Sequence, residues 1–438
     1  MFTLILTAGL RRLFVPAVYF AATISWSPLF AQESATARTV AATKPALKCS
    51  ACQCAIESGT ICKECALTTA AARSTKPAAM QKTGNVYTLD NDPTNNALAV
   101  YTRVSNGSLM PVAGSPFPLK GRGLSGGDID EQGAIRVHGE FVLAVNPGSD
   151  TIAVLRKTGA GLMHVPGSPF ASGGSTPLSL TVHGDMVYVA NQAAPFAGPK
   201  TKPNISGFRM MADGKLVAVP NSRVEFPAGQ GPAQVEFSPN GKTLVATAGF
   251  QADDASRLYA FKVERDGRVT MGKGSPIMPQ GATGTVGFSW SKSGNRVYAS
   301  LFKGSAVIAF DVEPMTASIR QSSKPVGDDQ QAACWTAISR DGQTLYVGNF
   351  VSNSVSVYDI SGKQPALLGS VPRRGTSGKD TKDIELSADG KYLYAVGSGL
   401  RQISVFRVES NRLLTELPPG QSPLMVASGQ NITGLAVD

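Results

Sequence analysis

The sequence predicts an all-β fold, a seven-bladed β-propeller that closes by pairing its C-terminal strand with its N-terminal blade. One observation is a hairpin unit with a turn glycine that recurs about every 50 residues, as in propeller repeats. The other is composition: charged residues make up only 16% of 438 residues, alongside 46 glycines and 28 prolines. Low charge with many turn residues argues against long solvated helices. The 42% share of hydrophobic residues argues against a disordered chain.

The hairpin turns define the repeat. Their glycines are Gly139, Gly184, Gly241, Gly294, Gly342 and Gly390. The turns at Gly241, Gly342 and Gly390 read Asn-Gly or Asp-Gly. These pairs are strong hairpin signals, because glycine tolerates a positive φ. Each turn therefore predicts two antiparallel strands.

The segments between the turns predict further strands. Runs of β-branched and aromatic residues follow the turns, at 186–191, 344–349 and 392–396. Third strands are expected at 151–155, 306–310, 354–358 and 402–406, and weaker outer strands at 216–219 and 366–368. Four antiparallel strands in each repeat is the pattern of a propeller blade. A helical solenoid would need a 3.6-residue period instead.

The first blade is expected to be incomplete. Residues 84–119 contain three predicted strands, at 86–89, 97–101 and 109–112, and lack an innermost strand. Residues 432–437 supply one more strand at the other end of the chain. Pairing between these two segments would close the ring and leave no long open sheet edge.

The region before the repeats divides into two predicted segments. Residues 1–31 are typical of an export signal: Arg11 and Arg12 precede an apolar run, and Ala31 ends a plausible cleavage site. Residues 32–83 form a low-complexity linker, and residues 84–438 form the propeller. No later run reaches 18 apolar residues, so no membrane span is expected after signal removal. The protein is thus expected in the periplasm or outside the cell.

Five cysteines form a cluster in the linker. They are Cys49, Cys52, Cys54, Cys62 and Cys65, in the spacing C-x2-C-x-C-x7-C-x2-C. Two C-x2-C pairs suit a tetrahedral zinc ion. An oxidising compartment favours disulfides over zinc, although five is an odd number. The sixth cysteine, Cys334, lies in an apolar strand and is expected in the core.

The net charge of +10 does not make a nucleic-acid partner the expected one. The export signal carries two basic residues and no acidic ones, and residues 32–83 carry seven basic and three acidic residues. The propeller therefore retains a charge of only +4. Such a small, diffuse excess is weak support for nucleic-acid binding.

The blades resemble those of lactonase-type seven-bladed propellers, a family that includes 6-phosphogluconolactonases and muconate-lactonising enzymes and borders on YVTN-repeat propellers. The resemblance covers essentially residues 84–438. It is carried by residues 345–349 and 354–359, by residues 237–242 and 386–391, and by Gly-Ser-Pro elements at 114–116, 167–169 and 274–276. It implies the propeller fold and an origin among lactone hydrolases.

The catalytic residues of that family do not carry over. Its enzymes resemble one another in a Pro-Arg-His element and a following Asn-Glu, where this chain has Pro232-Ala233-Gln234 and Ala248-Gly249. Another family histidine is replaced within residues 176–179. Two of the three histidines, His138 and His183, lie in hairpin turns on the face opposite the usual binding mouth. The expected function is therefore a ligand- or partner-binding propeller that has lost the catalytic His, Arg and Glu. The alternative is a diverged lactone hydrolase acting on a sugar lactone or related ester.

The loops leading into the inner strands carry candidate catalytic residues. These are Asp128, Asp130, Glu131, Arg373 and Arg374. A carboxylate there could act as a base on a lactone carbonyl, with an arginine stabilising the oxyanion. The acidic loops, including Asp253 and Asp254, could instead hold calcium. These charges could also be solvated loop residues with no ligand.

The candidate ligand-binding residues fall into two groups. Arg136, Glu236 and Glu385 occupy comparable positions in inner strands, near the axis of the ring. Asp328, Asp329, Lys379 and Lys382 lie in or beside the leading loops. A carboxylate near the axis needs a charged partner or channel water. The expected partner of the protein is a small molecule or a protein at the mouth of the propeller.

Overall fold

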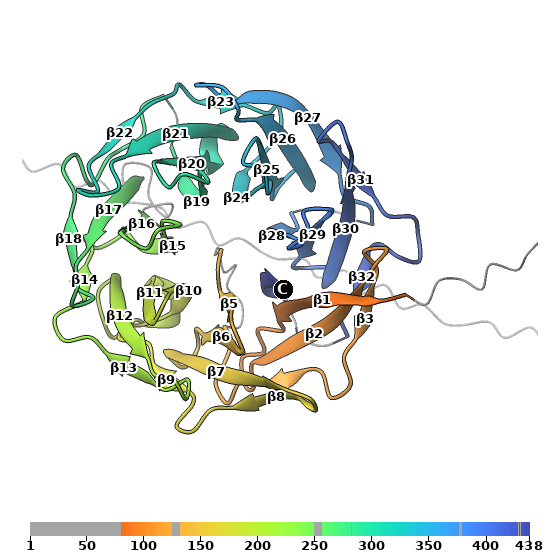
Figure 1. The fold of residues 1–438 in the computed structure, drawn as a ribbon, viewed down its shortest axis with the longest axis horizontal. Coiled ribbons are helices and arrows are strands. Elements are labelled where there is room, and N and C mark those ends of the chain that lie inside the picture. Colours follow the sequence, from red (N-terminus) through yellow and green to blue (C-terminus); the bar gives the residue numbers. More distant parts are fainter. Residues whose placement is uncertain are drawn as a thin grey trace, which may run out of the picture. The chain divides into compact units, whose positions relative to one another are not determined.

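The computed structural model describes residues 80–124, 132–248, 256–281, 283–375, 379–427, 429 and 431–438. They belong to one compact unit, Pro77–Asp438. Seven antiparallel sheets of four or five strands are arranged around a common axis (Figure 1). The predicted seven-bladed β-propeller is therefore confirmed. The export signal and the cysteine cluster lie outside the described residues.

The first two blades contain ten strands. From the axis outward, blade 1 consists of β33 (Thr433–Val437), β1 (Lys82–Leu89), β2 (Ala97–Val104) and β3 (Leu109–Pro111), with β4 (Phe117–Pro118) also on β2. Blade 2 consists of β5 (Ile135–His138), β6 (Phe141–Asn146), β7 (Thr151–Thr158) and β8 (Gly161–His164), with β9 (Phe170–Ala171) on β7.

Blades 3 to 5 follow the same order. Blade 3 consists of β10 (Pro177–His183), β11 (Met186–Asn191), β12 (Asn204–Met210), β13 (Leu216–Ala218) and β14 (Val224–Glu225). Blade 4 consists of β15 (Pro232–Phe237), β16 (Thr243–Ala248), β17 (Arg257–Val263) and β18 (Val269–Met271). Blade 5 consists of β19 (Thr285–Trp290), β20 (Arg296–Leu301), β21 (Ala306–Val312), β22 (Ile319–Gln321) and β23 (Val326–Gly327).

Blades 6 and 7 complete the ring. Blade 6 consists of β24 (Ala333–Ile338), β25 (Thr344–Asn349), β26 (Ser354–Asp359) and β27 (Ala366–Pro372). Blade 7 consists of β28 (Thr381–Leu386), β29 (Tyr392–Gly397), β30 (Gln402–Val408), β31 (Leu414–Glu416) and β32 (Leu424–Met425). Two short 3-10 helices, η1 (Pro195–Ala197) and η2 (Phe302–Gly304), lie between strands. Among the described residues, no helix is long and apolar enough to cross a membrane.

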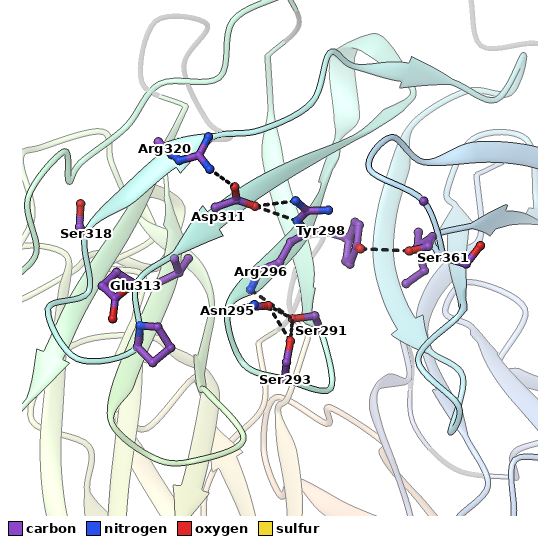
Figure 2. Close-up of a pocket in the computed structure, with 14 residues that line it drawn as sticks. Ser291, Ser293, Asn295, Arg296, Tyr298, Asp311, Glu313, Ser318, Arg320 and Ser361 are labelled. Carbon is purple, nitrogen blue, oxygen red and sulfur yellow. Dashed lines mark hydrogen bonds and ion pairs between the residues drawn. The ribbon is translucent and has the colours of Figure 1, made fainter.

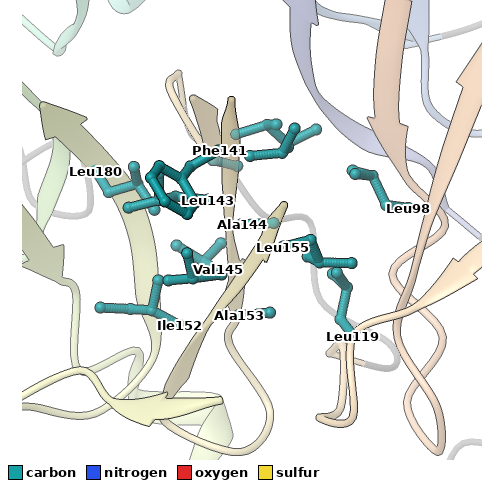
Figure 3. Packing of buried hydrophobic residues seen from close by; sticks show 14 of the residues in the cluster. Leu98, Leu119, Phe141, Leu143, Ala144, Val145, Ile152, Ala153, Leu155 and Leu180 are labelled. Carbon is teal, nitrogen blue, oxygen red and sulfur yellow. The ribbon is translucent and has the colours of Figure 1, made fainter. Parts of the chain in front are cut away.

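The core lies between the blades rather than at the centre of a single sheet. In strands such as β6, β11 and β29 all six residues are buried, because each sheet packs on a neighbour on both faces. Figure 3 shows blade 2 packed on both faces: Leu143 lies on the side of Leu180 of blade 3, and Leu155 lies on the side of Leu98 of blade 1. This double burial explains why the second strands read as nearly continuous apolar runs.

The six turn glycines have the backbone conformation that the sequence predicts. Their φ angles lie between 57° at Gly139 and 77° at Gly342. L-residues rarely adopt this region, and glycine enters it without steric cost. The register across the turn, with His183 opposite Met186 in blade 3, confirms a tight hairpin between the first two strands.

The serine of the Gly-Ser-Pro element has a repeated structural role. Ser115 accepts a hydrogen bond from the Val100 amide at 2.8 Å, and Ser168 accepts one from Val154 at 2.9 Å. Ser275 accepts one from the Ala260 amide at 2.9 Å. In each of these three blades the hydroxyl thus satisfies a third-strand amide where the outer strand turns away.

The ring closes between β33 and β1, as expected. Val86 pairs with Val437, and Tyr87 pairs with Ala436, in an antiparallel register. The Asp438 carboxylate accepts hydrogen bonds from the Asn85 amide at 2.6 Å and the Tyr87 hydroxyl at 2.9 Å. Lys157 of blade 2 lies 3.0 Å from the same carboxylate. The final residue therefore links two blades as well as the two ends of the propeller.

Candidate functional site: a polar cavity at the axis of the ring

The inner strands enclose a cavity of about 280 Å³ close to the axis. Its lining includes Arg136 from β5, Glu236 from β15 and Glu385 from β28. Inner strands from different blades meet around the axis, so side chains distant in sequence converge there. The three candidate residues that the sequence places near the axis are thus brought to one cavity.

Arg136 is held against two neighbouring blades. Its Nε donates to the Leu180 carbonyl oxygen at 3.1 Å. Its Nη2 lies 3.8 Å from Oε1 of Glu236, and the two side chains are 20% and 31% exposed. The arginine is therefore positioned by blade 3 and pairs loosely with a carboxylate of blade 4.

Gln234 is anchored to blade 5 by both ends of its amide. Its Nε2 donates to the Phe288 carbonyl at 2.9 Å, and its Oε1 accepts from the Phe288 amide at 2.7 Å. Nε2 also lies 3.1 Å from Oε2 of Glu236. Gln234 stands at the position that the family resemblance assigns to a histidine. Here that side chain fixes one blade to the next.

The carboxyl groups of the cavity are shifted towards their neutral forms. Burial raises the pKa of Glu385 to about 7; Arg136 lowers it and the charge of Glu236 raises it. Burial likewise raises the pKa of Glu236, against the opposing effects of Arg136 and Gln234. Perturbed carboxyl groups facing a cavity are a common mark of functional sites.

Asp383 lies two residues before Glu385 on the same strand. It is 2% exposed, and its Oδ2 accepts from the Leu435 amide at 3.0 Å. Burial and the charge of Glu385 raise its pKa well above the usual aspartate range, and Arg136 opposes that shift. Asp383 belongs to the inner strand β28 and not to the loop that precedes it.

Gln132 spans the axis from blade 2 to blade 6. Its Nε2 donates to the Thr336 carbonyl at 2.6 Å, and its Oε1 accepts from the Thr336 amide at 3.1 Å. The Gln132 carbonyl accepts from the Ser179 hydroxyl. Gln132, which precedes β5, and Pro239, in the hairpin turn of blade 4, both line the cavity. The lining thus includes residues from before an inner strand and from a hairpin turn.

The arginines of blade 7 lie elsewhere. The Arg373 side chain has no exposed surface; its Nη1 lies 3.5 Å from Oδ2 of Asp380 and donates to Thr381 Oγ1 at 3.0 Å. Arg374 pairs with Glu416 at 3.3 Å and is 39% exposed. Burial of Arg373 favours a structural role over contact with a substrate.

The remaining candidates of the leading loops are also separated from the cavity. Asp328 accepts hydrogen bonds from the Ser305 and Ser356 hydroxyls, both at 2.9 Å, and is 1% exposed. Lys382 is 2% exposed, with its Nζ 4.2 Å from the centre of the Phe350 ring. Asp329 and Lys379 are exposed on the surface.

Several predicted residues cannot be placed. Asp128, Asp130, Glu131, Asp253 and Asp254 lie outside the described residues, as does the cysteine cluster at 49–65. Across the part of the chain that the structure describes, no group of three His, Cys, Asp or Glu side chains is arranged to hold a metal ion. Zinc at the cysteines and calcium at the acidic loops stay predictions. Cys334 is buried, as expected.

A larger cavity, of about 800 Å³, lies between blades 5 and 6 (Figure 2). Asp311 in this groove binds both Arg296, at 2.8 Å, and Arg320. The Ser293 hydroxyl donates a hydrogen bond to Asn295 Oδ1 at 2.6 Å. These two polar groups of the lining are therefore also engaged within the protein. Because these charges neutralise one another, the groove offers a ligand less unpaired charge than the axial cavity does.

One family comparison gives a match. Residues 327–426 match the family described as lactonase, 7-bladed beta-propeller. No curated protein matches the chain.

Solved structures share the fold over most of the chain. A candidate 6-phosphogluconolactonase from Bacteroides uniformis has a TM-score of 0.65 at 18% identity, covering 82% of this chain and 100% of that one. Another, from Bacteroides fragilis, has a TM-score of 0.62 at 18% identity, covering 81% and 98%. The periplasmic gluconolactonase of Pseudomonas aeruginosa has a TM-score of 0.62 at 17% identity, covering 81% and 98%. At these identities the likeness shows the propeller fold.

Proposed function

Because the chain is a seven-bladed β-propeller of the lactonase type, we propose that it binds a small polar molecule in the axial cavity and does not convert it chemically. The observation that carries this proposal is the convergence of Arg136, Glu236 and Glu385, from three blades, on one cavity of about 280 Å³. Small-molecule sites are typically enclosed pockets with a few convergent polar groups.

The replaced family residues support binding without hydrolysis. Ala233 and Ala248 are fully buried and carry no functional group. Gln234 uses both ends of its amide on the main chain of Phe288. An amide cannot serve as a general base, and loss of a general base typically costs a factor of about 10² to 10⁴ in rate.

Lactone hydrolysis is the second candidate, and one observation favours it. Burial, together with the charge of Glu236, places the pKa of Glu385 at about 7. A general base is most effective when its pKa lies near the working pH. Arg136 shares the cavity and could stabilise an oxyanion.

One experiment separates the two candidates. Purified protein is titrated calorimetrically with D-sorbitol, D-glucamine, D-gluconate and D-glucono-δ-lactone, and lactone opening is followed above the spontaneous rate. We expect at least one compound to bind, Glu236→Ala to weaken that binding about tenfold or more, and lactone opening to stay at background. Loss of a charged side chain that contacts the ligand typically has an effect of this size or larger.

The matched control is Glu409→Gln, which removes an exposed carboxylate paired with Arg407 on the outside of blade 7. It should bind like the wild type. Absence of binding by all four compounds would contradict the proposal. Lactone turnover that Glu385→Gln abolishes would establish the hydrolase instead.

Export is part of the proposal. Its support is the signal-like pattern of residues 1–31, together with the fold shared with a protein described as a periplasmic gluconolactonase. Fractionation of expressing cells, with N-terminal sequencing of the mature chain, tests it. Recovery of the uncleaved chain solely in the cytoplasm would contradict it.

A further inference from the structure

Most hydrogen-bonding groups of the neutral side chains around the axial cavity are engaged within the protein. Both amide ends of Gln132 bind Thr336, and both amide ends of Gln234 bind Phe288. The hydroxyls of Ser289 and Thr336 bind each other at 2.8 Å. These groups hold the blades together, so the polar character left to a ligand comes mainly from the charged side chains.

Those charged side chains are mainly acceptors. Glu236 and Glu385 line the cavity, and the charge of Asp383, two residues before Glu385 on β28, interacts with that of Glu385. Among the lining residues that the structure describes, Arg136 is the sole cation. One guanidinium therefore shares the lining with two carboxyl groups, and ionised carboxylates accept hydrogen bonds without donating any.

Asp383 adds a polar group without a partner beside Glu385. The side chain is 2% exposed, and its Oδ1 has no hydrogen-bond partner among the described residues. A buried polar group without a partner is costly. Burial and the charge of Glu385 oppose ionisation of Asp383, and a cation bound nearby would favour it.

Resting on the proposed function, we infer that the axial cavity selects a small organic cation, a primary ammonium that carries hydroxyl groups, over neutral and anionic molecules of the same size. An ammonium supplies three donors and a positive charge to the carboxylates. Hydroxyl groups can donate to the remaining carboxylate oxygens. The volume of about 280 Å³ admits a single small molecule of this kind.

The same electrostatics disfavours anions. A carboxylate or phosphate ligand would meet Glu236 and Glu385 at short range, and like charges brought together in an enclosed site repel strongly. The aldonates and phosphorylated sugar acids are therefore the poorest ligands for this cavity. This selectivity is opposite to that of a site for a sugar phosphate.

Binding of a cation is coupled to protons. The titratable groups facing Glu385 are Arg136 on β5, Glu236 on β15 and Asp383 on β28. The pKa of Glu385 is about 7 without ligand, and a neighbouring cation lowers the pKa of a carboxyl group. Binding at neutral pH thus releases protons, and affinity rises between pH 6 and pH 8.

Three compounds on one carbon skeleton test this selectivity. D-Glucamine, D-sorbitol and D-gluconate differ in a single terminal group, which is an ammonium, a hydroxyl or a carboxylate. We expect glucamine to bind at least about tenfold more tightly than sorbitol, and gluconate to bind more weakly than either. Calorimetry in buffers of different ionisation enthalpy should show proton release on glucamine binding at pH 7.

Two variants assign the effect to the carboxylates. Glu236→Gln and Glu385→Gln should each weaken glucamine binding at least about tenfold and change sorbitol binding far less, and Glu409→Gln should change neither. Without ligand, the raised pKa of Glu385 means that the folded state holds the proton more tightly. The wild type should therefore lose stability relative to Glu385→Gln as pH rises from 5 to 8. That comparison also shows whether the variant folds.

The outcomes distinguish this inference from the function on which it rests. Absence of binding by all three compounds overturns both. Sorbitol or gluconate binding as tightly as glucamine overturns the selectivity alone. Calcium chloride is titrated in parallel; calcium binding that Glu385→Gln abolishes would show a metal site and overturn the choice of an organic cation.

Discussion

Deletion of residues 432–438 is expected to abolish cooperative folding of the propeller. These residues include β33, which is the innermost strand of blade 1. Leu435 is fully buried, and loss of such a side chain alone typically costs about 2–5 kcal/mol. The deletion also removes the main-chain hydrogen bonds to β1 and exposes its edge. The combined loss of free energy reaches the free energy of unfolding of a typical domain, about 5–15 kcal/mol.

Urea titration followed by tryptophan fluorescence and far-UV circular dichroism measures this effect. The control is Asp438→Asn, which keeps β33 and alters only the carboxylate that binds Asn85, Tyr87 and Lys157. It should retain a cooperative transition at a lower midpoint. A deleted chain that unfolds cooperatively at the wild-type midpoint would show that β33 is dispensable.

Asp380→Ala is expected to destabilise the protein by about 3–5 kcal/mol, because it leaves the buried guanidinium of Arg373 without its carboxylate. Both side chains are essentially inaccessible, at 0% and 1% exposure. The arginine side chain has little room to move towards Gly397, because its Nη2 already lies against that glycine. A Cβ placed on Gly397 would be only 2.2 Å from Arg373 Nη2. Denaturant titration measures the loss.

A double substitution keeps this prediction specific. Replacing the pair together, as Arg373→Met with Asp380→Leu, should cost less than Asp380→Ala alone, because it leaves no buried charge without a partner. Asp266→Ala, which breaks an exposed ion pair with Arg268, should cost no more than about 1 kcal/mol. Equal losses for Asp380→Ala and Asp266→Ala would contradict the structural role of the buried pair.

The fold was predictable because its signals are local and repeated. A glycine at positive φ in each hairpin turn, such as Gly342, can be recognised from a few neighbouring residues. Pairing of β33 with β1 could also be inferred, because blade 1 lacks one strand and only one unassigned strand remains. The number of strands in each blade was therefore enough to predict the contact between β33 and β1.

The axial cavity was predictable only in part. Glu236 and Glu385 occupy equivalent positions of two inner strands, so the repeat itself places both near the axis. Gln132 escaped prediction because its partner, Thr336, lies 204 positions away and the contact exists only after the ring forms. The one available signal was a polar residue placed just before a short inner strand.

In the loops that lead into the inner strands, the burial of charged side chains could not be predicted from the sequence. Their charges suggest a solvent-filled mouth, yet Arg373, Asp380 and Asp328 are almost completely buried. In sequence, a loop arginine that binds a ligand and one that pairs with a neighbouring aspartate are alike. Burial there depends on how β28 and β30 pack around the loop, as in the contact of Arg373 with Ser404, and no local pattern encodes that packing.

The closure of blade 1 has a kinetic consequence. The Thr88 hydroxyl donates to the Thr433 carbonyl, and these residues are 345 positions apart. A contact between residues so far apart in the sequence forms late in folding, because a large loop must be closed before the contact can contribute to stability. Until β33 is available, β1 presents an unpaired strand to its surroundings during synthesis. The nascent chain is then most exposed to misassembly at this one edge, and a chaperone that shields β1 would act where protection is most needed.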